Sequence, residues 1–146
     1  MMTFEGLAEA NCSCVLTVIQ SAEENTSDYF CKRISEARIT NKDFKSYWER
    51  GKRPQDMARC DEVLSYKGIS VNCLRDSSEE EIMGHYRITL AMAPRGTSKY
   101  FCKFRFFPDA GKVRPNLEDS FFHCNFFKAD LFSKEFVMVI DVQRLM

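Results

Sequence analysis

The chain has 146 residues, of which 45% are hydrophobic and 29% charged, and its 21 basic and 21 acidic residues give a formal net charge of zero. This length and composition predict one soluble globular domain, residues 1–146, and exclude intrinsic disorder. Zero net charge argues against a dedicated nucleic-acid binder, which usually carries a basic excess. Thirteen phenylalanines, most of them in the second half, favour a sheet packed against helices.

The first elements follow from residue type and spacing. β-Branched residues between Asn11 and Gln20 predict a strand. A helix is then predicted because apolar residues recur at helical spacing. These residues are Tyr29, Phe30, Ile34 and Ala37, with Arg33 among them.

A second helix is predicted after Thr40. Thr40 and Asp43 have the spacing of a capping box, with Asp in the place of the usual Glu or Gln. Phe44, Tyr47 and Trp48 would then share one face that points to the core. Gly51 is placed to end this helix in the left-handed conformation.

A third helix and a short strand are predicted next. Pro54 fits the first turn of the helix, and Gly68 ends it. The apolar positions of this helix are Met57, Cys60, Val63 and Leu64. Residues 69–73 alternate as a strand does, and the acidic stretch 76–81 indicates either a solvated turn or the start of a helix.

From His85 onward the period changes to two, which predicts a hairpin. Tyr86, Ile88, Leu90 and Met92 form one stripe, and Tyr100, Cys102, Phe104 and Phe106 form the matching one. The opposite face carries aromatic and basic residues: Arg87, Phe101, Lys103, Arg105 and Phe107.

Two further strands complete the sheet. A turn at residues 108–112 precedes a strand at 121–127, and the apolar run at 136–142 predicts a central strand. The predicted fold class is α+β: an antiparallel sheet of about four to six strands, with two or three mostly N-terminal helices packed on one face. The helix-rich part would cover about residues 21–67 and the sheet-rich part about residues 69–146.

The seven cysteines are predicted to be reduced thiols in a cytoplasmic protein. The N-terminal stretch is acidic and resembles no secretory signal, and no apolar stretch is long enough to span a bilayer, so no membrane partner is expected.

Motifs for catalysis and cofactor binding are absent from the sequence. Cys12 and Cys14 are too close for a zinc knuckle, and adjacent His123 and Cys124 would point to opposite faces of a strand, so no metal and no cofactor is expected. A thiol enzyme would need a nearby histidine, which leaves Cys102 with His123 or Cys73 with His85 as candidate pairs. The alternative is that both histidines are surface residues.

Two surfaces remain as candidate binding sites. The hairpin face with Arg87, Lys103 and Arg105 resembles sheets that stack bases and contact phosphates, although a covering helix would explain it equally well. The other surface surrounds Trp48, where Arg50, Lys52 and Arg53 are suited to an acidic peptide or a phosphate; the alternative is that Trp48 packs on the core and the bases lie in a loop.

The basic residues of the second surface belong to a local block, since residues 32–53 hold eight bases against three acids. We therefore expect an interaction or regulatory module that binds a protein partner through the Trp48–Arg53 region. A nucleic-acid binder using the hairpin face and a small enzyme with a Cys/His pocket are the alternatives. A homodimer through an exposed apolar edge strand is a further expectation.

Overall fold

The computed structural model describes residues 23–24, 28–40, 42–74, 78–93, 95, 98–115, 123–129 and 137–146. Its elements in chain order are β1 (Glu23–Glu24), β2 (Phe30–Ile34), α3 (Cys60–Lys67), β3 (Ile69–Cys73), α4 (Glu79–Met92), β4 (Tyr100–Phe106), β5 (Gly111–Pro115), β6 (His123–Lys128) and β7 (Val137–Arg144). The strand predicted between Asn11 and Gln20 lies outside the described residues.

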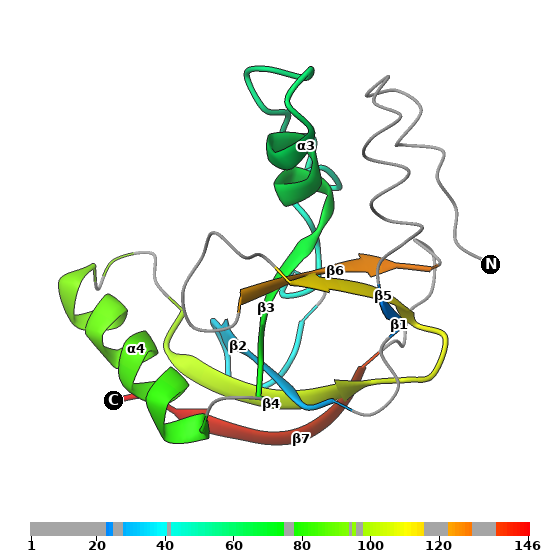
Figure 1. Ribbon diagram of the computed structural model, residues 1–146. Helices are drawn as coiled ribbons and strands as arrows, with labels where there is room; N and C mark the ends of the chain where they lie inside the picture. Colours follow the sequence, from blue (N-terminus) through cyan, green and yellow to red (C-terminus); the bar gives the residue numbers. More distant parts are fainter. Residues whose placement is uncertain are drawn as a thin grey trace.

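The strands form one antiparallel sheet in the order β1-β5-β6-β3-β2-β4-β7 (Figure 1). Six strands have five to eight residues, and β1 adds two residues at one edge. The α+β prediction is therefore confirmed. The helices are not N-terminal as predicted, because α3 and α4 follow β2 and β3, respectively.

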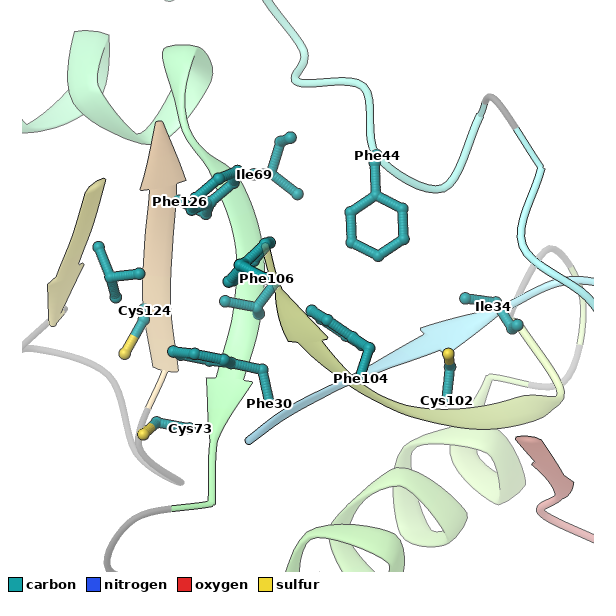
Figure 2. Packing of buried hydrophobic residues seen from close by; sticks show 12 residues of the cluster. Phe30, Ile34, Phe44, Ile69, Cys73, Cys102, Phe104, Phe106, Cys124 and Phe126 are labelled. Carbon is teal, nitrogen blue, oxygen red and sulfur yellow. The ribbon is translucent and has the colours of Figure 1, made fainter. Parts of the chain in front are cut away.

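The sheet is strongly curled around a phenylalanine core. Phe106 of β4 and Phe126 of β6 stack with ring centroids 3.8 Å apart, although β2 and β3 lie between these strands in the sheet. Phe30 and Phe104 pack into the same interior, and Phe44 closes it from a loop (Figure 2). The predicted stripe of β4 therefore faces the concave side, since Cys102, Phe104 and Phe106 all belong to this core.

The predicted helix at residues 29–37 is wrong, because Phe30–Ile34 is strand β2. This strand lies between β3 and β4 and buries side chains on both faces. Phe30 and Ile34 belong to the concave core, whereas Cys31 packs under α4 on the convex face. Burial on both faces removes the alternation typical of a strand, which is why the pattern indicated a helix.

The predicted first strand of the hairpin, residues 85–92, is also wrong, because these residues lie in helix α4. Ser78 accepts a hydrogen bond from the Glu81 amide, so the acidic stretch is a capped helix start. The convex-face cluster under this helix consists of Cys31, Ile82, Met83, Tyr86, Leu90, Phe101 and Leu145. Ile88 and Met92 are 61% and 81% exposed, so half of the predicted apolar stripe is in solvent.

The predicted third helix is shorter than expected. The backbone before Cys60 forms turns, and the Asp56 carboxylate accepts a hydrogen bond from the Ala58 amide at 3.0 Å. This local bond competes with the helical hydrogen-bond pattern. Helix α3 therefore begins six residues after Pro54 and ends at Gly68 as predicted.

Strand β7 lies at an edge of the sheet, so the prediction of a central position is wrong. It pairs with β4, and Met138, Val139 and Ile140 are 43–46% exposed. A continuous apolar run does not distinguish a central strand from an edge strand whose apolar side chains face solvent.

Candidate anion-binding site

The site begins where two neighbouring strands separate. Strand β2 pairs with β4 over five residues but with β3 over only two, Phe30 with Cys73 and Cys31 with Asn72. Beyond Cys31 the two strands diverge. The Lys32 ammonium group reaches across this gap and donates a hydrogen bond of 2.9 Å to the Ser70 carbonyl.

Residues 42–51, here called the 42–51 segment, cover this gap with tight turns instead of the predicted helix. Thr40 and Asp43 make the predicted capping-box contact, because the Asp43 carboxylate accepts hydrogen bonds from the Thr40 amide at 2.7 Å and from its hydroxyl at 3.2 Å. The turn that follows stops at Phe44, which is buried against Phe104 with centroids 5.1 Å apart. Phe44 thus fixes the segment onto the concave core.

A second capping box starts a single helical turn at Ser46. The Ser46 amide donates to the Glu49 carboxylate at 3.2 Å, and the Glu49 amide donates to the Ser46 hydroxyl at 3.1 Å. The turn ends at Gly51 with φ 84°, as predicted, where the Lys52 and Gly51 amides donate to the Tyr47 and Trp48 carbonyls, respectively. One turn forms because both of its ends are capped within six residues.

An ion pair holds this turn against the sheet. The Lys128 ammonium of β6 lies 3.2 Å from the Glu49 carboxylate, and the two side chains are 8% and 21% exposed. Arg50 adds a second tie, because its guanidinium donates to the Lys42 carbonyl at 2.6 Å. The 42–51 segment is therefore fixed at both ends.

The strands and the 42–51 segment enclose a polar cavity of about 300 Å³, here called the cation cavity. Five serines line it, among them Ser35, Ser70 and Ser98. The charged residues that line it are five bases and one acid: Lys32, Arg33, Lys42, Lys45, Arg50 and Asp43. The described walls therefore carry a formal excess of four positive charges.

Several of these polar groups are not used by the fold. The Asp43 carboxylate is used by the fold, because it accepts two hydrogen bonds from Thr40, and it supplies the one negative charge among the described lining residues. Within the part of the chain that the structure describes, the ammonium groups of Lys42 and Lys45 form no ion pair. Arg33 Nη1 has no hydrogen-bond partner among the described residues, but the Arg33 guanidinium lies 5.5 Å from the centroid of the Tyr86 ring of α4. The ammonium groups of Lys42 and Lys45 are therefore the groups available to an anionic ligand.

The pKa of Lys32 reflects this environment. Desolvation under the 42–51 segment lowers it from 10.5 to about 8, the nearby Asp43 carboxylate opposes this change, and Arg50 and Arg33 lower the pKa further. Lys32 is consequently charged at neutral pH but loses its proton in mildly alkaline solution.

The other predicted residues of the Trp48 surface are not among the described residues that line the cavity. Arg53 and Lys67 place their cationic groups 3.6 Å from the centroid of the Trp48 ring, and two groups this close must lie on opposite faces of the ring. Arg53 also donates to the Trp48 carbonyl at 3.0 Å. Lys52 lies over the exposed Tyr47 ring at 5.4 Å. Of the four predicted residues, Arg50 alone lines the described cavity.

The basic residues of the predicted hairpin face do not form one open surface, although Lys103 and Arg105 both lie over the Tyr29 ring, at 5.0 and 5.2 Å from its centroid. Phe101 is fully buried under α4, and Arg87 lies on that helix, where its Nε donates to the Leu145 carbonyl at 2.8 Å. Lys103 forms an ion pair with Glu79, which raises the pKa of Lys103. Helix α4 is thus the covering helix considered as the alternative.

Four of the five described cysteines are free thiols buried in the fold, and the fifth forms a disulfide. Cys31, Cys73, Cys102 and Cys124 carry thiols, as predicted, but Cys60 is disulfide-bonded, so the prediction of reduced cysteines is wrong there. No spacing in the sequence had indicated this bond.

Two of the thiols are poor nucleophiles, because burial raises the pKa of both Cys31 and Cys102 to about 12. His123 hydrogen-bonds the Ser70 hydroxyl. In the described ranges, no three His, Cys, Asp or Glu residues are grouped as metal ligands.

Comparison with protein-family models, with curated proteins and with solved structures found no match. In the described part of the chain, neither helix has the length and apolar character needed to cross a membrane.

Sequence reasoning found the basic block but not the cavity. Five of the eight bases between residues 32 and 53 line it, and four of these were not chosen as site residues: Lys32, Arg33, Lys42 and Lys45. The local excess of bases was the available signal. The separation of β2 from β3, which places the strand bases opposite the loop bases, has no counterpart in the sequence pattern.

Proposed function

We propose that the protein is an interaction module that binds a protein partner, and that an acidic group of this partner enters the cation cavity. The observation that carries the proposal is the cavity wall of five bases and one acid, with that acid already hydrogen-bonded to Thr40. Complementary charge directs partner choice and association rate.

An exposed aromatic side chain at the rim of the cavity favours a protein as the binding partner. Tyr47 lines the cavity and is 52% exposed, and exposed tyrosines are enriched where proteins contact one another. The 42–51 segment is fixed by Glu49, Lys128 and Arg50, so the binding surface is preformed and loses little conformational entropy on association.

The test compares two double charge reversals. Purified protein is titrated with fluorescently labelled peptides, acidic and neutral, of the same length. Lys42→Glu with Lys45→Glu should abolish binding of acidic peptides, whereas Arg38→Glu with Arg59→Glu, which changes two exposed bases outside the cavity lining, should leave most of it. Circular dichroism confirms that both variants fold. Equal binding by the two variants, or no acidic peptide bound at low salt, contradicts the proposal.

We place this module in the cytoplasm as part of the same proposal. The four thiols in the described core support this location, because secreted domains usually pair their cysteines. The Cys60 disulfide is the observation against it. Association of two copies along the exposed edge of β7 stays a prediction, which light scattering at several protein concentrations can check.

A further inference from the structure

We infer that the acidic group taken up by the cation cavity is a phosphate, carried by a phosphorylated side chain of the protein partner. This inference rests on the proposed function and makes it specific, since the proposed function requires only an acidic group. A carboxylate and a phosphate differ in charge and in the number of oxygens that accept hydrogen bonds.

The charge of the cavity matches a phosphate better than a carboxylate. The described lining residues carry a formal excess of four positive charges, and a carboxylate neutralises one of them. A phosphorylated side chain carries between about −1.5 and −2 charges at neutral pH. Among the described lining residues, the unused cations are Lys42 and Lys45.

The hydrogen-bond donors also fit a phosphate. The cavity presents ammonium, guanidinium and hydroxyl donors from several directions: two strands, the 42–51 segment and Ser98 before β4. In the described part of the structure, the hydroxyls of Ser35 and Ser98 have no hydrogen-bond partner. Three phosphate oxygens can use donors spread in this way, whereas the two oxygens of a carboxylate lie in one plane.

The volume of the cavity limits the ligand to a small group. About 300 Å³ is at the lower end of the range for ligand pockets, and it suits one modified side chain rather than a folded segment or a run of nucleotides. Tyr47 at the rim would then contact the residues that flank the phosphorylated one.

Lys32 links this binding to pH. The charged groups that face it are Asp43 and Arg50 from the 42–51 segment and Arg33 from its own strand. Because the pKa of Lys32 is about 8 without ligand, a bound dianion must raise it, and affinity must fall as the pH rises above 8. Between pH 7 and pH 9 the expected loss is about tenfold, because one proton is taken up on binding. Lys32→Arg keeps the charge and should remove this loss.

The experiment uses defined probes and the whole chain. Inorganic phosphate, N-acetyl-phosphoserine amide and N-acetyl-aspartate amide are titrated separately into nitrogen-15-labelled protein. The amide signals of Ser46, Gly68 and Ser70, which surround the cavity, are followed by NMR. We expect the two phosphate probes to bind at least about tenfold more tightly than the aspartate probe.

A matched pair of variants places the binding in the cavity. Lys42→Ala with Lys45→Ala should weaken phosphoserine binding about tenfold, because two charge-assisted contacts are lost. Arg38→Ala with Arg59→Ala removes the same charge from two exposed bases outside the cavity lining and should change affinity less than twofold.

The outcomes separate the two proposals. Aspartate binding as tight as phosphoserine binding overturns the phosphate inference and leaves the proposed function standing. Binding of phosphate that moves signals elsewhere, or that is equally weak in both variants, also overturns it. If no probe and no acidic peptide binds, both proposals fail. Tighter phosphate binding that shifts the three cavity amides supports both.

Discussion

Replacing Lys32 by methionine should stabilise the protein at neutral pH. Methionine keeps most of the apolar length of the side chain but cannot be charged. The wild-type pKa of about 8, against 10.5 for an ordinary lysine, means that folding disfavours the charged form by about 3 kcal/mol at pH 7. Loss of the hydrogen bond to the Ser70 carbonyl offsets about 1.5 kcal/mol of this gain. The expected net increase in the free energy of unfolding at pH 7 is about 1.5 kcal/mol.

The pH dependence is the diagnostic part of this prediction. The unfolded chain keeps its Lys32 proton up to pH 10.5, whereas the folded chain releases it near pH 8, so the wild type gains stability between these values. Relative to Lys32→Met, the wild type should gain about 1.4 kcal/mol by pH 9 and about 2.5 kcal/mol by pH 10. The advantage of the variant should therefore disappear and then reverse.

Urea unfolding at pH 7, 9 and 10, followed by circular dichroism, measures this difference directly. Lys52→Met is the control, because Lys52 is exposed and its replacement should give a difference that does not change with pH. A Lys32→Met difference that stays constant from pH 7 to pH 10 would refute the idea that folding desolvates this lysine. Unequal slopes against urea would show that the variant changes the unfolding transition itself.

Three further predictions test the core, the sheet and the cysteines. Phe44→Ala should lower the free energy of unfolding, measured by urea titration, by about 3 kcal/mol, because the Phe44 side chain is only 3% exposed. A loss below about 1 kcal/mol would mean that Phe44 does not close the core. Gly111→Ala should strongly destabilise the protein, because the added Cβ would lie 2.1 Å from the Phe127 carbonyl oxygen. Gly84→Ala in α4 should raise the free energy of unfolding by about 1 kcal/mol, because its Cβ would meet nothing within 4 Å. Similar melting temperatures for the two variants would contradict this contrast. Peptide mapping without reductant should recover Cys60 in a cross-linked peptide, and a Cys60 that alkylates without reduction would contradict the disulfide.

The sequence predicted those strands whose one-sided burial produces an alternating pattern. Strand β4 is such a case from Cys102 to Phe106, because Cys102, Phe104 and Phe106 face the core and Lys103 and Arg105 do not, whereas Phe101 at its start is buried on the other face. Strand β2 is buried on both faces, so its alternation is lost and its spacing resembles that of a helix. The wrong prediction of a helix at β2 arises from the position of this strand between two others in the sheet, and not from the secondary-structure preferences of its residues.

Helix α4 could have been found from its start. Ser78 and Glu81 have the spacing of a capping box, and three acids occupy the first turn. The alternation from Tyr86 to Met92 overrode this signal, although Tyr86 and Leu90 are also four residues apart and share one helical face. When two periods fit the same residues, a capping signal is the stronger guide, because it involves a specific backbone hydrogen bond.

The cation cavity was beyond sequence reasoning for a different physical reason. Its bases come from a strand and from a loop, and they converge because β2 leaves β3 after Cys31 and the 42–51 segment folds over the gap. The capping boxes at Thr40 and Ser46 are local and readable in the sequence. The ion pair between Glu49 and Lys128 positions the second of these turns. It joins residues 79 positions apart, so it cannot be read from the sequence.

The charges of the cavity divide into those that build it and those that do not. Asp43 and Arg50 hydrogen-bond backbone or hydroxyl groups of the loop, so their removal would disturb its shape. Lys42 and Lys45 have no such role in the described structure, although they line the same cavity as Lys32. Uncharged polar residues at these two positions would serve the fold equally well. Charged side chains that the fold does not use are typical of a functional site, where a ligand supplies the opposite charge. This division is why the substitutions that test binding are placed at Lys42 and Lys45, where a loss of affinity cannot be attributed to a loss of structure.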